Sequence, residues 1–172
     1  MAGSIQSFKS SFQTDLSRPS RFDVQIYPQF GTDRSLLYRC ENAQLPGKTI
    51  ATTEQRTYGP VEKFPYLMTY NDLDLTFMIT DDMKQKYFFD KWFELINPAS
   101  TNNFGYKSDY SADLLITQYD VANRPSYSVH IIDAYPISMN QLDLDWSSDG
   151  YHKLVITFAY TRWKQNTDYT VF

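Results

Sequence analysis

The chain has 172 residues and carries 16 Lys and Arg against 20 Asp and Glu, which gives a formal net charge of -4 at pH 7. That length fits a single domain, and an acidic balance without a basic run argues against a protein that grips nucleic-acid phosphates. A single cysteine, Cys40, excludes an internal disulfide, and no secretory signal or membrane span is recognisable. We therefore expect synthesis in a reducing cytoplasm.

Aromatic residues make up 17% of the chain, with 14 Tyr and 12 Phe. Tyrosine joins a flat apolar ring to a polar tip, so an excess of it suits surfaces that become buried against partners. A tyrosine-rich sheet in a monomeric protein is the alternative that composition leaves open.

The first 17 residues predict an N-terminal arm. Apolar side chains recur every three or four positions, at Ile5, Phe8, Phe12 and Leu16, and line one face of a short helix. Because so few helical turns are marginal by themselves, segment 1–17 either docks on a neighbouring molecule or frays.

From residue 18 onward the pattern changes to the period of strands. Phe22, Val24 and Ile26 alternate with polar residues before Pro28, and 34–41 predicts a second strand. After a break at Leu45-Pro46-Gly47, residues 48–60 are rich in threonine and polar on both sides. We expect a projecting hairpin that pairs with another chain, with an exposed loop as the alternative.

The segment 71-NDLDLTFMI-79 alternates cleanly and predicts a half-buried strand. Its inward side chains are Leu73, Leu75, Phe77 and Ile79. A helix over about 81–96 follows, with Thr80 as its cap and with Asp81 and Asp82 in the first turn, where the helix dipole favours anions. The pair Asn97-Pro98 ends this helix.

Further strands follow the helix, at 113–120, 126–139, 140–146 and 151–163, with a turn at 147–150. The stretch 140-NQLDLDW-146 repeats the NxLDL phrase of 71–75, and we interpret both copies as the start of a strand with one wet and one apolar side. The tail, 164–172, hangs free or lies on a neighbour. The whole predicts a mainly β (α+β) fold, an antiparallel β-sandwich or barrel with one flanking α-helix and a projecting hairpin. It forms a single domain, 1–172, with its core at 18–163.

Two pairs of acids are spaced as catalytic carboxylates could be, Asp72 with Asp74 and Asp143 with Asp145. Residues two apart on a strand lie roughly 6.5–7 Å apart, a separation that paired catalytic carboxylates use. The alternation places these acids opposite the leucines that face the core, so we interpret them as solvated side chains.

No other sequence motif indicates a catalytic or ligand-binding site. His130 and His152 are isolated, Cys40 is interpreted as a half-buried strand thiol, and no glycine-rich phosphate loop is present. We therefore predict no catalytic, cofactor-binding or metal-binding residue.

Four blocks in order resemble the tail tube protein family of contractile-tailed bacteriophages of the T-even type. They are RPSRFDVQI, YRCENAQLPGK, LDLTFMITDDMKQKYFFDKWFELI and QLDLDWSSDGYHKLVITFAYTRW, and together they span about Arg18 to Trp163. The chain departs from the family pattern at 29–36, in the aromatic loop near Tyr106 and Tyr110, and in the tail after Trp163.

The resemblance implies a structural protein of the virion. Six copies would close into a ring whose strands join into one barrel around a channel, and rings would stack into the tube through which DNA leaves. The implied partners are further copies of the chain, the tail sheath, and the baseplate and tail terminator proteins. The DNA passes without specific binding, and no membrane is involved.

By position, the resemblance assigns contacts between subunits or rings to the turn before the hairpin and to the hairpin at 49–65. From its aromatic residues, we expect the tail to be buried on assembly as well. The candidate residues are Leu45, Pro46, Gly47, Thr52, Thr53, Arg56, Tyr58, Tyr169 and Phe172. An acidic lining suits a conduit for DNA because cations would grip phosphates. Our hypothesis is that lumen-facing or seam acids are among Asp72, Asp74, Asp143 and Asp145.

Three alternatives remain open from the sequence. A baseplate protein that initiates the tube or joins it to the hub belongs to the same structural class. A tube-like protein of a type VI secretion system has a similar fold. An enzyme of the baseplate that degrades the cell wall is supported only by the acid pairs.

Overall fold

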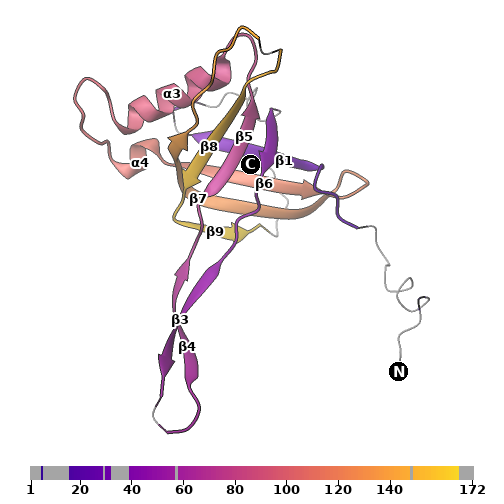
Figure 1. The fold of residues 1–172 in the computed structure, drawn as a ribbon, viewed down its shortest axis with the longest axis vertical. Helices are drawn as coiled ribbons and strands as arrows, with labels where there is room; N and C mark the ends of the chain where they lie inside the picture. The colour runs from indigo at the N-terminus through magenta and orange to yellow at the C-terminus, as the bar shows by residue number, and fades with distance from the viewer. Residues whose placement is uncertain are drawn as a thin grey trace.

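The computed structural model describes residues 5, 16–28, 30–31, 39–56, 58–147 and 149–166 (Figure 1). Most of the predicted arm at 1–17, most of the segment 29–36 and the end of the tail lie outside these residues. Predictions for those segments, including contacts by Tyr169 and Phe172, stay predictions.

Strands that are far apart in the sequence pair along one antiparallel path. The path runs β1-β6-β7-β8-β5-β2, and β9 pairs with β7 outside it. The strands are β1 (Phe22–Pro28), β2 (Cys40–Ala43), β5 (Leu73–Met78), β6 (Ala112–Tyr119), β7 (Pro125–Met139), β8 (Lys153–Ala159) and β9 (Arg162–Gln165). The two ends of the path, β1 and β2, form no ladder with each other in the part of the chain that the structure describes. The predicted antiparallel, mainly β fold is confirmed, and the described residues do not form a closed barrel.

The longest strand, β7, joins two groups of strands. Its first part pairs with β6 and β9, and its last part pairs with β8. We call β1, β6, the first part of β7 and β9 the first sheet, and the last part of β7 with β8, β5 and β2 the second sheet. Strands of the two sheets run across each other in Figure 1.

A bulge in β7 marks the passage from the first sheet to the second. Asp133 there has a left-handed φ of 56°, and the register with β6 shifts at the same place. The carboxylate of Asp113 on β6 holds the bulge: Oδ1 accepts the backbone N–H of Asp133 at 3.2 Å, and Oδ2 lies 3.0 Å from Nε2 of His130. His130, isolated in the sequence, thus has a structural partner.

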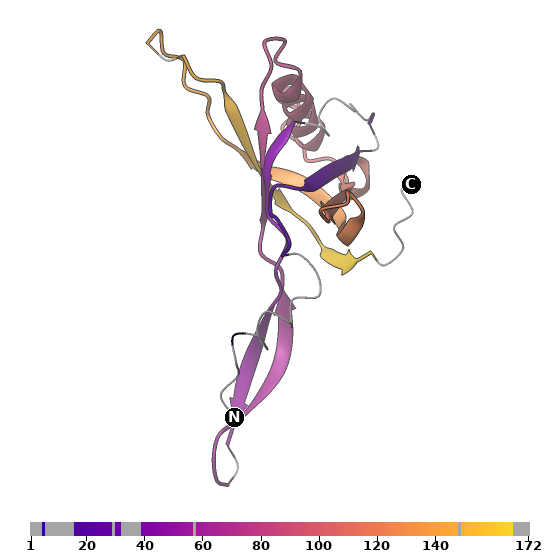
Figure 2. The same ribbon diagram turned by 90° about the vertical axis from the view of Figure 1, so that its right-hand side faces the viewer.

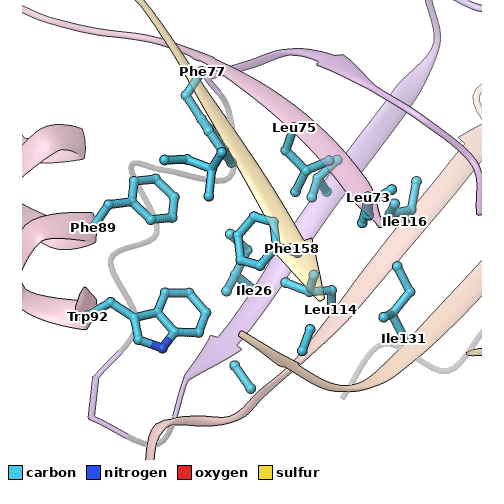
Figure 3. Packing of buried hydrophobic residues seen from close by; sticks show 14 of the residues in the cluster. Ile26, Leu73, Leu75, Phe77, Phe89, Trp92, Leu114, Ile116, Ile131 and Phe158 are labelled. Atoms are coloured by element: carbon cyan, nitrogen blue, oxygen red, sulfur yellow. The ribbon is translucent and has the colours of Figure 1, made fainter. Parts of the chain in front are cut away.

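Side chains from both sheets and from the helix α3 (Lys84–Ile96) fill one core (Figure 3). Leu73, Leu75 and Phe77 of β5 are buried, as their alternation predicts. The ring centroid of Phe77 lies 5.2 Å from that of Phe89 on α3, and Trp92 of α3 lies 5.8 Å from Phe158 of β8. These aromatic contacts dock the flanking helix on the second sheet.

The helix begins at Lys84 rather than at Asp81, and neither Asp81 nor Asp82 lies in its first turn. Met83 before it has a left-handed φ of 50°, so the chain turns once more before the helix starts. The side chain of buried Gln85 explains the delay, because its Oε1 accepts hydrogen bonds from the backbone N–H and the hydroxyl of Thr80 at 3.3 and 3.1 Å. Thr80 therefore braces the turn instead of capping the helix.

The prediction of a strand over 140–146 is wrong. β7 ends at Met139, β8 begins at Lys153, and no described residue between them belongs to a strand. Asn140 ends the ladder because its side-chain Oδ1 accepts the backbone N–H of Val155 at 2.7 Å and its Nδ2 donates to the carbonyl of Lys153 at 3.1 Å. The predicted strand 151–163 is likewise divided into β8 and β9.

Candidate assembly surfaces

A two-stranded hairpin projects far from the core (Figures 1 and 2). Among the described residues its strands, β3 (Thr49–Gln55) and β4 (Glu62–Thr69), pair with each other and with no other strand. Every residue of β4 is exposed, and Ala51 alone in β3 is half-buried. An isolated two-stranded ribbon is at best marginally stable in water, so this hairpin is a candidate surface for contact with another molecule.

Both faces of the hairpin carry apolar side chains. Residues directly opposite each other point to the same side of a ribbon; Ile50 pairs with Met68, whereas Ala51 pairs with Leu67 and Thr53 with Phe64. Ile50, Met68, Leu67 and Phe64 are between 45% and 53% exposed. No single packing partner on one side would cover all of them.

The sequence patterns considered above did not single out this apolar strand. Residues 48–60, which are polar, predicted the hairpin, and the resemblance assigns contacts to 49–65, but the apolar residues at 66–68 received no surface role. The signal was present, since apolar side chains occupy consecutive positions in KFPYLM and no period-two pattern sends them to a core.

The candidate contact residues that the structure describes lie along this one projection. Leu45, Pro46 and Gly47 precede its base, Thr52 and Thr53 lie exposed in β3, and Arg56 and Tyr58 stand near its tip. Tyr58 is 97% exposed. The structure spreads these residues from base to tip and does not gather them into one patch.

Trp163 of β9 anchors the base of the hairpin. Its indole Nε1 donates to the carbonyl oxygen of Gly47 at 3.2 Å, and Nζ of Lys48 lies 3.9 Å from the ring centroid. A hydrogen bond and a cation–π contact on one ring contribute about 1 kcal/mol each. The indole ring of Trp163 therefore fixes the base of the hairpin to the edge of the first sheet.

Replacing Trp163 by leucine is expected to loosen the hairpin. Losing about 1.5 kcal/mol of local contacts should speed backbone hydrogen exchange at the hairpin base on the order of tenfold. The measurement is hydrogen exchange of the unassembled protein followed by mass spectrometry. Trp163→Phe keeps an aromatic ring under Lys48 and should give a smaller rise; equal exchange in wild type and Trp163→Leu would contradict the anchor.

Several polar side chains lie on the outer side of the second sheet. Asp74 of β5 accepts a hydrogen bond from the hydroxyl of Thr157 at 2.7 Å, and Glu41 of β2 pairs with Lys153 of β8 at 2.7 Å. The hydrogen bond from Lys153 lowers the pKa of Glu41, so that carboxyl stays ionised. Asp72 is exposed beside β5 and, after burial, is the second cause that raises the pKa of Tyr160.

The two acid pairs do not come together. Asp72 and Asp74 belong to the second sheet, whereas Asp143 and Asp145 lie on the excursion between β7 and β8. Asp145 accepts hydrogen bonds from the backbone N–H and hydroxyl of Ser147, both at 3.0 Å. The backbone bond is the largest cause that lowers the pKa of Asp145, the opposite of what the general acid of a glycosidase requires.

The thiol of Cys40 and the possible metal ligands show no sign of a reactive site. Burial is the largest cause that raises the pKa of Cys40 to about 12, so its thiol stays protonated and is a poor nucleophile. Among the described residues no group of three or more His, Cys, Asp or Glu side chains is placed to hold a metal ion. None of the helices in the described part of the chain is long and apolar enough to cross a membrane.

Several solved structures share this fold. A chain of the cryo-EM structure of the anti-feeding prophage baseplate, 6-fold symmetrised, matches with a TM-score of 0.68 at 14% identity, over 90% of this chain and 97% of that chain. A chain of an extracellular contractile injection system, from the PVC sheath-tube complex in the extended state, gives 0.66 at 16% identity, over 91% and 96%. The sheath/tube terminator structure of that system gives 0.68 at 16%, over 90% and 99%. No curated protein sequence matches.

At these identities the likeness shows a fold, that of chains found in contractile injection systems. A family model described as phage tail tube protein matches residues 7–166, almost the whole sequence. The chain belongs to this phage tail tube protein family.

Proposed function

We propose that this protein is the subunit of a contractile tail tube. Copies associate into rings, six to a ring, and the rings stack into a tube whose channel conducts the genome into the host. The observation that carries the proposal is the hairpin of β3 and β4, whose two apolar faces are exposed in the single subunit. The family match over residues 7–166 supports it.

The open ends of the strand path give the ring its lateral contacts. β1 and β2 are unpaired on one side in the described part of the chain, and such edges expose rows of backbone N–H and C=O groups that another strand can complete. The anti-feeding prophage baseplate that shares this fold is 6-fold symmetrised, which supports a ring of six. Heterologous contacts of this kind close into rings when the rotation is right.

The second sheet is the proposed channel wall. Its outer side carries Asp74 and the Glu41–Lys153 pair, and Asp72 stands exposed beside it. A wall with an excess of carboxylates gives duplex DNA no phosphate contacts, so DNA slides without specific binding. A three-dimensional map of the tube with a net positive channel wall would contradict this part of the proposal.

The partners follow from this place in the particle. A sheath surrounds the tube, a baseplate starts it and a terminator protein ends it; matching chains come from structures of a baseplate, a sheath-tube complex and a sheath/tube terminator. The protein is made in the host cytoplasm and ends in the virion. A baseplate initiator and a type VI secretion tube protein are the alternatives within the same fold class.

Electron microscopy of the purified protein tests the proposal. Alone or seeded with baseplates, the protein is expected to form long tubes of uniform width with a central channel. Rings that never stack would favour the secretion-tube alternative, and tubes that stop after one or two rings would favour a baseplate initiator. A protein that stays monomeric at high concentration would refute the tube.

A further inference from the structure

The excursion between β7 and β8 is the second projection of the subunit, opposite the hairpin. We call its described residues, 140–147 and 149–152, the Trp146 loop. Leu73 of β5 pairs with Phe158 of β8, and Met78 pairs with Lys153. The hairpin enters β5 at the Leu73 end, whereas the Trp146 loop enters β8 at the Lys153 end, so the two leave opposite ends of the second sheet (Figures 1 and 2).

Large apolar side chains on the Trp146 loop are exposed in the part of the chain that the structure describes. Trp146 is 107% exposed, Leu144 is 87% exposed and Tyr151 is 58% exposed. Together with Asp143 and Asp145 they line a shallow hollow between the two limbs of the loop. The lining of this hollow mixes aromatic and apolar side chains with acidic ones. A fully solvated tryptophan at such a place is typical of a binding hot spot, because Trp is enriched among the few residues that contribute most of the binding free energy.

Hydrogen bonds hold the Trp146 loop in a defined shape although its large apolar side chains are exposed. Asn140 bonds to the backbone of β8 at its start, Ser147 bonds to Asp145 within it, and the hydroxyl of Tyr151 donates to Glu41 at 3.2 Å. Such ties lower the entropy cost of binding, since less freedom is lost when a partner arrives.

The charges of the two projections are complementary. Residues 140–152 contain Asp143, Asp145 and Asp149 and no lysine or arginine. The hairpin segment 48–69 contains Lys48, Arg56 and Lys63 against two glutamates. Opposite charges at the rims of two apolar patches favour one orientation of docking.

We propose that the Trp146 loop of one copy receives the hairpin of a second copy in the neighbouring ring, with apolar hairpin side chains in its hollow. Head-to-tail contacts between two different patches repeat without closing, which is what growth along an axis requires. The inference rests on the proposed tube, and it assigns the axial contact to this pair of surfaces.

The test uses Trp146→Ala in the full-length protein, with Tyr87→Ala as the matched control. Tyr87 is 71% exposed on α3 and belongs to neither projection. Trp146→Ala is expected to keep ring formation, by native mass spectrometry, and to raise the critical concentration for tube growth on the order of 30-fold or more. Tyr87→Ala should polymerise like wild type.

A disulfide cross-link tests whether the hairpin of a second copy occupies the hollow of the Trp146 loop. Gly150 lines the hollow and is exposed, so Gly150→Cys keeps Trp146 in place; Tyr66 on the hairpin is 67% exposed. Mixing Gly150→Cys with Tyr66→Cys under mild oxidation should give a disulfide dimer between the two variants, and neither variant alone should give one in comparable yield. Unchanged tube growth in Trp146→Ala, or loss of its rings as well as its tubes, overturns the inference, and so does the absence of the mixed dimer in wild-type-like tubes. A wild-type protein that remains monomeric overturns the proposed function, and the inference with it.

Discussion

Replacing Phe64 and Leu67 together by serine is expected to abolish tube formation without unfolding the subunit. Both side chains lie on one face of the hairpin and are 45% and 49% exposed. Shortening them should therefore change the free energy of unfolding of the subunit only slightly. In the proposed tube the same side chains would be buried against another copy, where apolar anchors commonly contribute about 2 kcal/mol or more each. Sedimentation and negative-stain micrographs should therefore show no tubes.

A matched pair of changes on the same hairpin is the control. Glu54 and Lys63 form an ion pair at 3.5 Å with both side chains exposed, and exposed pairs contribute at most about 1 kcal/mol. Glu54→Gln with Lys63→Gln leaves both apolar faces in place and should allow tubes. Tubes of normal length from the serine variant would show that the hairpin is not an assembly surface.

Replacing Trp92 by alanine is expected to lower the free energy of unfolding by about 3–5 kcal/mol. The Trp92 side chain is fully buried, its ring packs on Phe89 and Phe158, and its Nε1 donates to the carbonyl of Tyr110 at 2.7 Å. Domains have only about 5–15 kcal/mol of stability in total. Urea denaturation should show a large fall in the midpoint with little change in slope.

The measurement needs an unassembled protein, because assembly stabilises the folded state by mass action. The serine variant of the hairpin provides that background. There, Trp92→Phe should lose about 1 kcal/mol for the hydrogen bond together with part of the packing, and Trp146→Ala should change stability by less than about 0.5 kcal/mol because its side chain is fully exposed. Equal stability of Trp92→Ala and Trp146→Ala would contradict the burial of Trp92.

Alternation in the sequence correctly predicted strands that bury one face in the core. Val24 and Ile26 of β1 and Leu73, Leu75 and Phe77 of β5 are buried as expected. The side chains of a strand point to opposite faces in turn, so a chain with apolar residues at every second position has one way to bury them. In the helix, the apolar positions Tyr87, Phe88, Trp92, Leu95 and Ile96 predict one buried stripe; Trp92 and Ile96 are buried, whereas Tyr87 and Leu95 are exposed.

Identical local patterns nevertheless had two outcomes. The NxLDL phrase at 71–75 leads into β5, which has β8 on one side and β2 on the other. The same phrase at 140–144 lies beyond the last rung between β7 and β8, where the side chain of Asn140 bonds to the backbone groups of Val155 and Lys153 that a continuing strand would pair with. An alternating sequence shows which side chains could face a core. It does not show whether the hydrogen-bonded ladder with the neighbouring strand continues.

The sequence by itself determined the mainly β class, the position of the helix to within a few residues, and, through four ordered blocks, the resemblance to tail tube proteins. Tertiary structure alone decided that Trp146 and Leu144 stand in water, that β4 is exposed along its length, and that the two projections leave opposite ends of one sheet. The reason is physical: periodicity acts within about one element, whereas exposure depends on what the rest of the chain brings to that element in space.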